Sequence, residues 1–360
     1  MSNKHLVKIA AFCLLITVSI GLLINARAQQ TTRAQRTSAT RQDLQSNDNV
    51  ASNYRISGPY THKNLTVFLV HGKDLLPGKN FLTLQEALAQ KKVRVYETKD
   101  VNELAIRNLS NQDVYVQSGD IVRGGDQDRM ISIDFIVPPH SGRMPIAAFC
   151  VESGRWSKRG NEQSAWFSSS ENAVATRDLK LAAKSANSQD AVWEKVSVAQ
   201  DKLSQNVGAT VNATVSTTSY ELAVENAKVR QTTAAYVNAL SGIMRNKSDV
   251  IGYAFAINGQ VNSADVYASH ALFAKLWPKL LKASATEALS ELDQEAKAEP
   301  VAEETIHEFL GASEKPKPQA KAVTERVRVV TREDDENVFF ETQDRAQKDA
   351  WVHRNYIRKQ

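Results

Sequence analysis

The chain has 360 residues, of which 42% are hydrophobic and 24% are charged, with two cysteines and a net charge of +5. This composition is typical of a soluble globular protein, and the 15 glycines are too few for collagen. Two cysteines exclude a disulfide framework, and 11 Phe, 9 Tyr and 5 Trp supply a core that a fully disordered chain would lack.

The first 28 residues have the layout of a secretory signal peptide. Lys4 and Lys8 precede an apolar run from Ile9 to Ile24, and Ala26-Arg27-Ala28 is a small-x-small cleavage site. A retained membrane anchor is the alternative, but the apolar run of about 16 residues is shorter than the roughly 20 that a spanning helix prefers. We therefore expect an exported protein, periplasmic or secreted, with no transmembrane segment after cleavage.

Cleavage changes both the charge and the cysteine count. It removes three positive charges and no negative charge, so the net charge falls from +5 to +2. A nearly neutral mature chain makes nucleic acid an unexpected partner. Cys150 is then the only cysteine, so the mature chain has no internal disulfide, and the thiol is either buried and inert or free.

A polar segment and then a strand-rich region follow the signal. Residues 29–58 are expected to form a flexible tether because the segment to about residue 53 has few large apolar side chains. From 64 to 152, short apolar runs and period-two alternation end at turn residues, a pattern typical of antiparallel strands. The expected strands are 67–70, 93–96, 104–107, 114–116, 131–137 and 146–152, with a short helix over 84–89.

The apolar spacing changes to a helical period between 173 and 246. Val192, Val196, Ala199 and Leu203 recur at i, i+4, i+7 and i+11, and a second stripe from Leu222 to Ile243 recurs every seven residues. These patterns predict a long pair of amphipathic helices.

A β-hairpin and another helix are expected after this pair. Asn258-Gly259 between the apolar runs 251–257 and 261–267 is a strong hairpin signal, because both residues accept positive φ. In the next helix, Pro278 is expected to produce a kink or a break.

The C-terminal region is expected to be peripheral. Residues 291–323 are rich in Ala, Glu, Lys and Pro and indicate a linker, and 324–360 indicate a β-hairpin followed by a basic tail from Trp351. Together the patterns predict an α+β fold with a single domain over 59–290. Its body is expected to be antiparallel and β-rich, sandwich-like or barrel-like, with the long helical pair inserted.

Four stretches, 118–129, 137–156, 188–193 and 252–277, together resemble a known family. They are similar to the ARG and rhodanese-phosphatase-superfamily-associated protein domain, whose pattern includes a Gly-Glu-x-x-x-Gly-Gly-x-Gln-x-Arg turn and a Cys-Val-Glu-x-x-Arg-Trp strand end. Asp120 stands where that family usually has Glu. The resemblance covers about residues 60–290 and implies an uncharacterised domain associated with ADP-ribose and phosphate chemistry.

The segment 119–129 is the main candidate site. Its glycines allow the backbone to approach a ligand, and the N–H groups and an arginine would suit an anion. The candidate ligand-binding residues are Asp120, Gly124, Gly125, Gln127, Arg129 and Arg155. A weaker alternative gives Asp126 and Asp128 to a hard cation, although the spacing does not match the helix-loop-helix calcium loop. The alternative is a purely structural role, as a tight hairpin turn in which Arg129 pairs with a carboxylate.

Cys150 and Glu152 are weak catalytic candidates. They point to the same face of a strand, and a thiol beside a carboxylate and a histidine would suit nucleophilic catalysis. His71 and His140 are the histidines considered, and neither is near in sequence. The alternative is a core cysteine beside a structural pair of Glu152 and Arg155.

Three functions remain open on these grounds. The favoured one is a non-enzymatic exported module that binds a protein, a glycan or an anionic small molecule, with no cofactor indicated. The second is a hydrolase or transferase that acts on a small phosphate-like or ADP-ribose-like substrate. The third is binding to nucleic acid or the cell envelope through the basic tail over 351–359.

Overall fold

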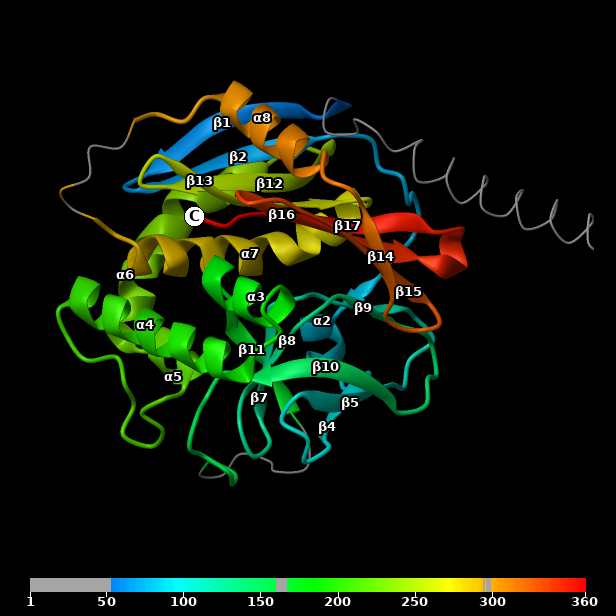
Figure 1. The fold of residues 1–360 in the computed structure, drawn as a ribbon, viewed down its shortest axis with the longest axis vertical. Coiled ribbons are helices and arrows are strands. Elements are labelled where there is room, and N and C mark those ends of the chain that lie inside the picture. Colours follow the sequence, from blue (N-terminus) through cyan, green and yellow to red (C-terminus); the bar gives the residue numbers. More distant parts are fainter. Residues whose placement is uncertain (1–52, 160–166, 294, 296–298) are drawn as a thin grey trace, which may run out of the picture. The chain divides into compact units, whose positions relative to one another are not determined.

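The computed structural model describes residues 53–159, 167–293, 295 and 299–360 (Figure 1). The expected signal peptide and the expected tether as far as residue 52 lie outside the described residues. Among the residues that are described, no helix is long and apolar enough to cross a membrane.

One large antiparallel sheet joins the two ends of the described chain. Its eight strands lie in the order β1 (Arg55–His62), β2 (Leu65–His71), β12 (Val250–Ile257), β13 (Gln260–Tyr267), β17 (Ala350–Arg358), β16 (Asn337–Asp344), β15 (Val327–Glu333) and β14 (Gln319–Ala322). Asn258 and Gly259 connect β12 to β13 with φ of 51° and 78°, so the expected hairpin is confirmed.

Two smaller sheets are built from the middle of the chain. Six strands lie in the order β11 (Phe167–Val174), β7 (Asp120–Gly124), β8 (Arg129–Ile131), β10 (Met144–Cys150), β5 (Glu103–Asn108) and β4 (Val93–Glu97). The edge strands β11 and β4 also contact each other, so this sheet is nearly closed. The third sheet contains β3 (Leu82–Thr83), β6 (Val114–Val116) and β9 (Phe135–Val137).

Helices cover both faces of the large sheet. The described helices are α2 (Leu84–Ala89), α3 (Arg177–Lys184), α4 (Gln189–Val207), α5 (Tyr220–Val224), α6 (Ala227–Leu240), α7 (His270–Ser290) and α8 (Glu303–Ser313), and α7 and α8 pack on the two faces of this sheet. Phe273 of α7 stacks on Tyr267, whereas Phe309 of α8 packs against Tyr356. Figure 1 shows α7 and α8 on opposite sides of the sheet.

The helix α7 is the centre of the molecule. It contacts β12 and β13 on one side and β11 and α4 on the other, and most of its side chains from Leu272 to Ser290 are buried. Pro278 was expected to kink or break this helix. The break does not occur: α7 continues through Pro278 as one helix. Packing on both sides offsets the backbone hydrogen bond that proline removes.

The structure differs from the sequence prediction at two strands. The strand β1 begins at Arg55, inside the expected tether, because pairing with β2 orders it. The expected strand 131–137 is two strands in different sheets, β8 and β9. Ser118 interrupts it: its hydroxyl donates to the Ser132 carbonyl at 2.9 Å, and its N–H donates to Asp134 at 2.7 Å.

The C-terminal region is integral to the fold. The expected linker contains α8, whose Ile306, Phe309 and Leu310 are buried, and the edge strand β14. The expected basic tail forms β17, which lies between β13 and β16. The predicted α+β class with a β-rich antiparallel body is confirmed.

Candidate functional site

The segment 119–129 contains the turn of a β-hairpin between β7 and β8, with Ile121 opposite Met130 and Val122 opposite Arg129. Gly124 and Gly125 have φ of 123° and 58°. A Cβ at Gly125 would lie 2.3 Å from Cζ of Phe167 and 2.8 Å from Oε2 of Glu97. The glycine is therefore required by the packing of the protein itself.

Arg129 is directed into the protein. Its guanidinium is buried and donates from Nη1 to the carbonyls of Val101, at 2.6 Å, and Asp100, at 3.2 Å. Nη2 donates to Oε1 of Glu97 at 3.3 Å. These contacts connect the turn after β4 to the hairpin. The pairing of Arg129 with a carboxylate agrees with the alternative of a structural hairpin turn.

Beside the hairpin lies a buried group of charges, which we call the loop cluster: Asp128, Glu152, Arg155 and Arg159. Arg155 donates from Nε and Nη2 to the two oxygens of Glu152, both at 2.7 Å. Arg159 donates to Oδ2 of Asp128 at 3.0 Å, and the N–H of Asp128 donates to Glu152 at 3.1 Å. The two carboxylates and the two guanidinium groups of the loop cluster thus balance each other's charge.

Burial and pairing act in opposite directions on the two acids of the loop cluster. Burial raises the pKa of Asp128 above its usual value, and its pairing with Arg159 only partly offsets this. For Glu152, burial also raises the pKa, but hydrogen bonds from Arg155 and Ser216 outweigh it and the pKa is lowered. Both carboxylates are fully buried, so a ligand would have to displace an existing partner to reach them.

The sequence patterns did not predict three residues that contact the carboxylates of the loop cluster. Arg159 and Ser219 both contact Asp128, and the Ser216 hydroxyl donates to Glu152. Ser219 had a readable signal, because it precedes α5 and caps it by accepting from the N–H of Leu222. The other two lie in loops without a distinctive pattern.

The remaining predicted ligand residues do not all have the same surroundings. Asp120 pairs with Lys279 of α7 at 2.8 Å and accepts from the N–H of Gln117. Gln127 is fully buried, and neither polar atom of its amide has a hydrogen-bond partner among the described residues. Arg155 lies in the loop cluster and donates from Nη1 to the carbonyl of Gly125 at 3.2 Å, so two of the six candidates contact each other, whereas Asp120 is paired with α7.

The residues that were weaker candidates for metal binding and catalysis have the following surroundings. Asp126 pairs with Lys99 at 2.6 Å and Asp128 with Arg159, and the described residues contain no group of three or more metal-ligating side chains. Cys150 is buried, and burial raises the pKa of its thiol to about 11. His71 is bound to Ser57 and Asp249 on the large sheet, and His140 is exposed.

A second buried group, the His353 cluster, contains His353, Asp134 and Asp265. Nδ1 of His353 lies 2.7 Å from Asp134, and Nε2 lies 3.0 Å from Asp265. The imidazole also stacks on the ring of Tyr267, with 4.4 Å between the two ring centroids. Both ring nitrogens are engaged, so neither is available as a base. No local pattern predicts this cluster, because Asp134 lies in a loop, Asp265 in β13 and His353 in β17.

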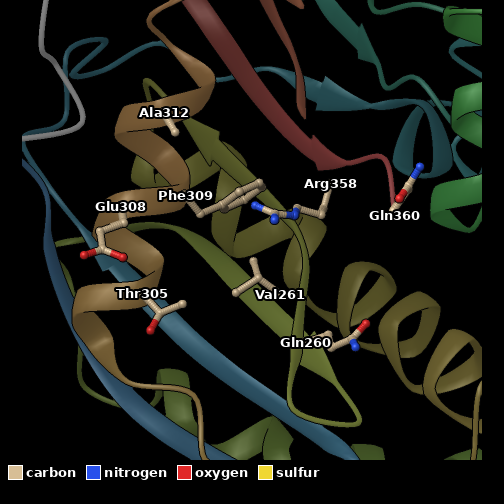
Figure 2. A pocket seen from close by; sticks show the side chains of 8 residues that line it. All are labelled: Gln260, Val261, Thr305, Glu308, Phe309, Ala312, Arg358 and Gln360. Atoms are coloured by element: carbon tan, nitrogen blue, oxygen red, sulfur yellow. The ribbon is translucent and has the colours of Figure 1, made fainter. Parts of the chain in front are cut away.

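The described surface has a concave site elsewhere, which we call the α8 groove (Figure 2). Its volume is about 640 Å³, within the range of ligand pockets. The lining side chains are Gln260, Val261, Thr305, Glu308, Phe309, Ala312, Arg358 and Gln360. They come from α8, from the start of β13 and from the C-terminal end of β17, so the site depends on the two segments expected to be peripheral.

Comparison with known proteins gives a family and no closer relative. Neither a curated protein nor a solved structure matches the chain. The model of one protein family matches residues 53–357, which include β1, α8 and nearly all of β17 as well as the region of the four motifs. The chain therefore belongs to the family described as the ARG and Rhodanese-Phosphatase-superfamily-associated Protein domain.

Proposed function

We propose that this protein is an exported, non-enzymatic binding module that holds its ligand in the α8 groove. The observation that carries the proposal is the groove itself, which combines an apolar floor of Val261, Phe309 and Ala312 with polar side chains around it. A few polar groups around an apolar surface are the usual form of a ligand site. The loop cluster offers less, because its arginines already donate to internal acceptors.

Export rests on the amino-terminal sequence alone. The positive start, the apolar run and Ala26-Arg27-Ala28 favour cleavage before Gln29. Mass spectrometry of the protein recovered from the cell envelope and the medium tests this, with a mature chain that begins at Gln29 as the expected result. An intact amino terminus on a cytoplasmic protein would contradict it.

A groove-filling substitution tests the binding site. Ala312 is half-buried in the groove, so Ala312→Trp should occupy the space above Phe309. We expect this variant to bind the amphipathic dye anilinonaphthalene sulfonate at least about tenfold more weakly than the wild type, because an apolar ligand loses its burial surface. The measurement is dye fluorescence in a titration of the folded protein.

Glu304→Trp is the matched control for the groove test. Glu304 is exposed on the same helix and is not part of the groove lining. This variant should bind the dye like the wild type, and both variants should keep the wild-type midpoint of urea unfolding. Equal dye binding by Ala312→Trp and the wild type would remove the groove as the site.

A second candidate function, binding of a small anion, is supported by another groove. It has a volume of about 500 Å³ between α6 and α7, and its lining includes Arg230 and Lys282 and no acidic side chain among the described residues. Calorimetric titration with inorganic pyrophosphate tests it. Heat of binding that disappears in Arg230→Gln would favour this function over the α8 groove.

A further inference from the structure

We infer that the α8 groove binds the carboxyl-terminal end of an extended peptide whose last residue is apolar, with Arg358 holding the terminal carboxylate. This inference rests on the proposed function, because it names the ligand class of the same groove. Three features of the groove support it: the cation at one wall, the rigid apolar floor, and the mixed polar groups along the rim.

The cation is Arg358, the last residue of β17. Its side chain is 37% exposed and lines the groove together with Phe309 (Figure 2). Its partner Glu336 is 68% exposed at 3.2 Å, and such exposed pairs contribute little stability. A ligand carboxylate over Phe309 would be better shielded from water and could accept two parallel N–H bonds. We therefore expect it to replace Glu336.

The floor is fixed from beneath. Phe309 is only 3% exposed and packs on Tyr356, whose hydroxyl donates to Glu314 at 2.6 Å. Arg354, buried next to it in the sheet, pairs with Glu341 at 2.6 Å. A floor held in this way loses little entropy when a ligand binds. Val261 and Ala312, which are half-buried, supply the accessible apolar surface of the groove, and this surface suits one aliphatic or aromatic side chain next to the carboxylate.

The rim distinguishes a peptide from a simple fatty carboxylate. Gln260 and Gln360 carry amides, and Thr305 carries a hydroxyl, so the rim offers both donors and acceptors. The backbone of a peptide needs both, whereas an alkyl chain needs neither. Figure 2 shows Thr305 and Glu308 on the α8 wall and Arg358 on the strand side. Because Glu308 repels a second negative charge, we expect selection for a single terminal carboxylate.

The test compares three probes on the folded mature protein. They are N-acetyl-Ala-Ala-Ala-Leu with a free carboxyl group, the same peptide with a carboxyl-terminal amide, and decanoate. Calorimetric titration should show binding of the acid peptide, with the amide at least about tenfold weaker, because a charge-assisted hydrogen bond is lost. Decanoate should bind more weakly than the acid peptide.

Variants of the protein complete the test. Arg358→Gln should abolish the difference between the acid and the amide peptide, whereas Arg358→Lys should retain part of it. Arg107→Gln removes one exposed positive charge outside the groove and should leave the difference unchanged. Unchanged urea midpoints identify variants that fold normally.

The results separate this inference from the proposed function. If Ala312→Trp abolishes dye binding but the acid and amide peptides bind equally, the groove is a site and the assigned ligand class is wrong. Tighter binding of decanoate than of peptide, or no peptide binding at all, also overturns the inference. If Ala312→Trp leaves dye binding unchanged, the proposed function itself fails.

Discussion

At the scale of single residues, the charged side chains around the β7–β8 hairpin are matched inside the protein. Asp120 is the clearest case, because it pairs with Lys279 at 2.8 Å and both side chains are more than nine-tenths buried. Asp120 was predicted to contact a ligand, and in the structure its carboxylate accepts a hydrogen bond from Lys279 of α7. Such a pair ties the hairpin to the central helix.

Removing one member of this pair should destabilise the protein strongly. Lys279→Met leaves Asp120 buried without its counter-charge, which costs about 3–5 kcal/mol of unfolding free energy. Urea denaturation monitored by circular dichroism measures the change. The double variant Asp120→Asn, Lys279→Met should recover a large part of the loss, because no isolated charge remains. A single variant within about 0.5 kcal/mol of the wild type would show that the pair is unimportant.

At the scale of elements, the strand β17 joins the two parts of the large sheet. It pairs with β13 on one side and β16 on the other, and the side chains from Val352 to Ile357 are buried. The basic residue Arg354 pairs with Glu341 inside the protein. Of the cations on which the proposal of a nucleic-acid-binding tail depended, Arg354 is therefore not available at the surface, whereas Arg358 remains partly exposed.

Deletion of residues 351–360 should prevent folding. Without β17, the backbone groups of β13 and β16 lose their partners, and the apolar face of α8 loses Tyr356. Loss of the cooperative thermal transition, followed by circular dichroism, is the expected result. Deletion of 359–360 alone is the control, since it leaves β17 intact. A folded 351–360 deletion would contradict the assignment of β17 to the interior of the sheet.

At the scale of the whole molecule, two buried ionic contacts connect segments that are far apart in the chain. In the His353 cluster, β17 and β13 meet the loop that carries Asp134. In the second contact, Arg326 donates to Asp344 at 2.8 Å and to Asp113, which precedes β6, at 3.0 Å. Burial raises the pKa of Asp113, but hydrogen bonds from Arg326 and Lys79 outweigh it and lower the pKa.

The His353 cluster gives the stability of the molecule a defined pH dependence. Burial lowers the pKa of His353, but attraction and hydrogen bonds from Asp134 and Asp265 outweigh it, so the pKa is raised. The stabilisation is therefore complete below about pH 6.5 and is lost as the pH rises through the folded-state pKa. The pKa of Asp134 is lowered, because its interactions with His353 exceed the effect of burial. Its contribution is complete above about pH 4 and is lost progressively as the pH falls from there towards the folded-state pKa.

Urea unfolding of the wild type and His353→Gln at several values between about pH 5.5 and 7.5 tests this. The difference in unfolding free energy should be largest at pH 5.5 and decrease towards pH 7.5, by at most about 1.4 kcal/mol per pH unit. Higher pH is avoided because burial lowers the pKa of Lys184 to about 8, and that group has the opposite sign. A difference that is constant or grows with pH would contradict a charged His353.

Local patterns predicted those elements whose side chains repeat with a regular period. The hairpin at Asn258-Gly259 and the helix α4 with its stripe from Val192 to Leu203 follow directly from short-range preferences. The stripe from Leu222 to Ile243 is interrupted instead, because Asn226 caps a new helix, α6. The α8 groove was not predictable, since Val261, Phe309 and Arg358 belong to three separate elements.

By itself, the sequence predicted the α+β class and the family and left a hairpin turn as one alternative for residues 119–129, because these depend on periodicity, turn chemistry and motifs within short stretches. Only the tertiary structure decided which charges are neutralised and which surface remains available. The Glu152–Arg155 pair was readable from its spacing, whereas the partners of Asp120 and His353 are contributed by distant strands and helices. Contacts with those elements pair the charges of the predicted binding loop, and pairing of β17 within the large sheet makes the expected tail one wall of the α8 groove.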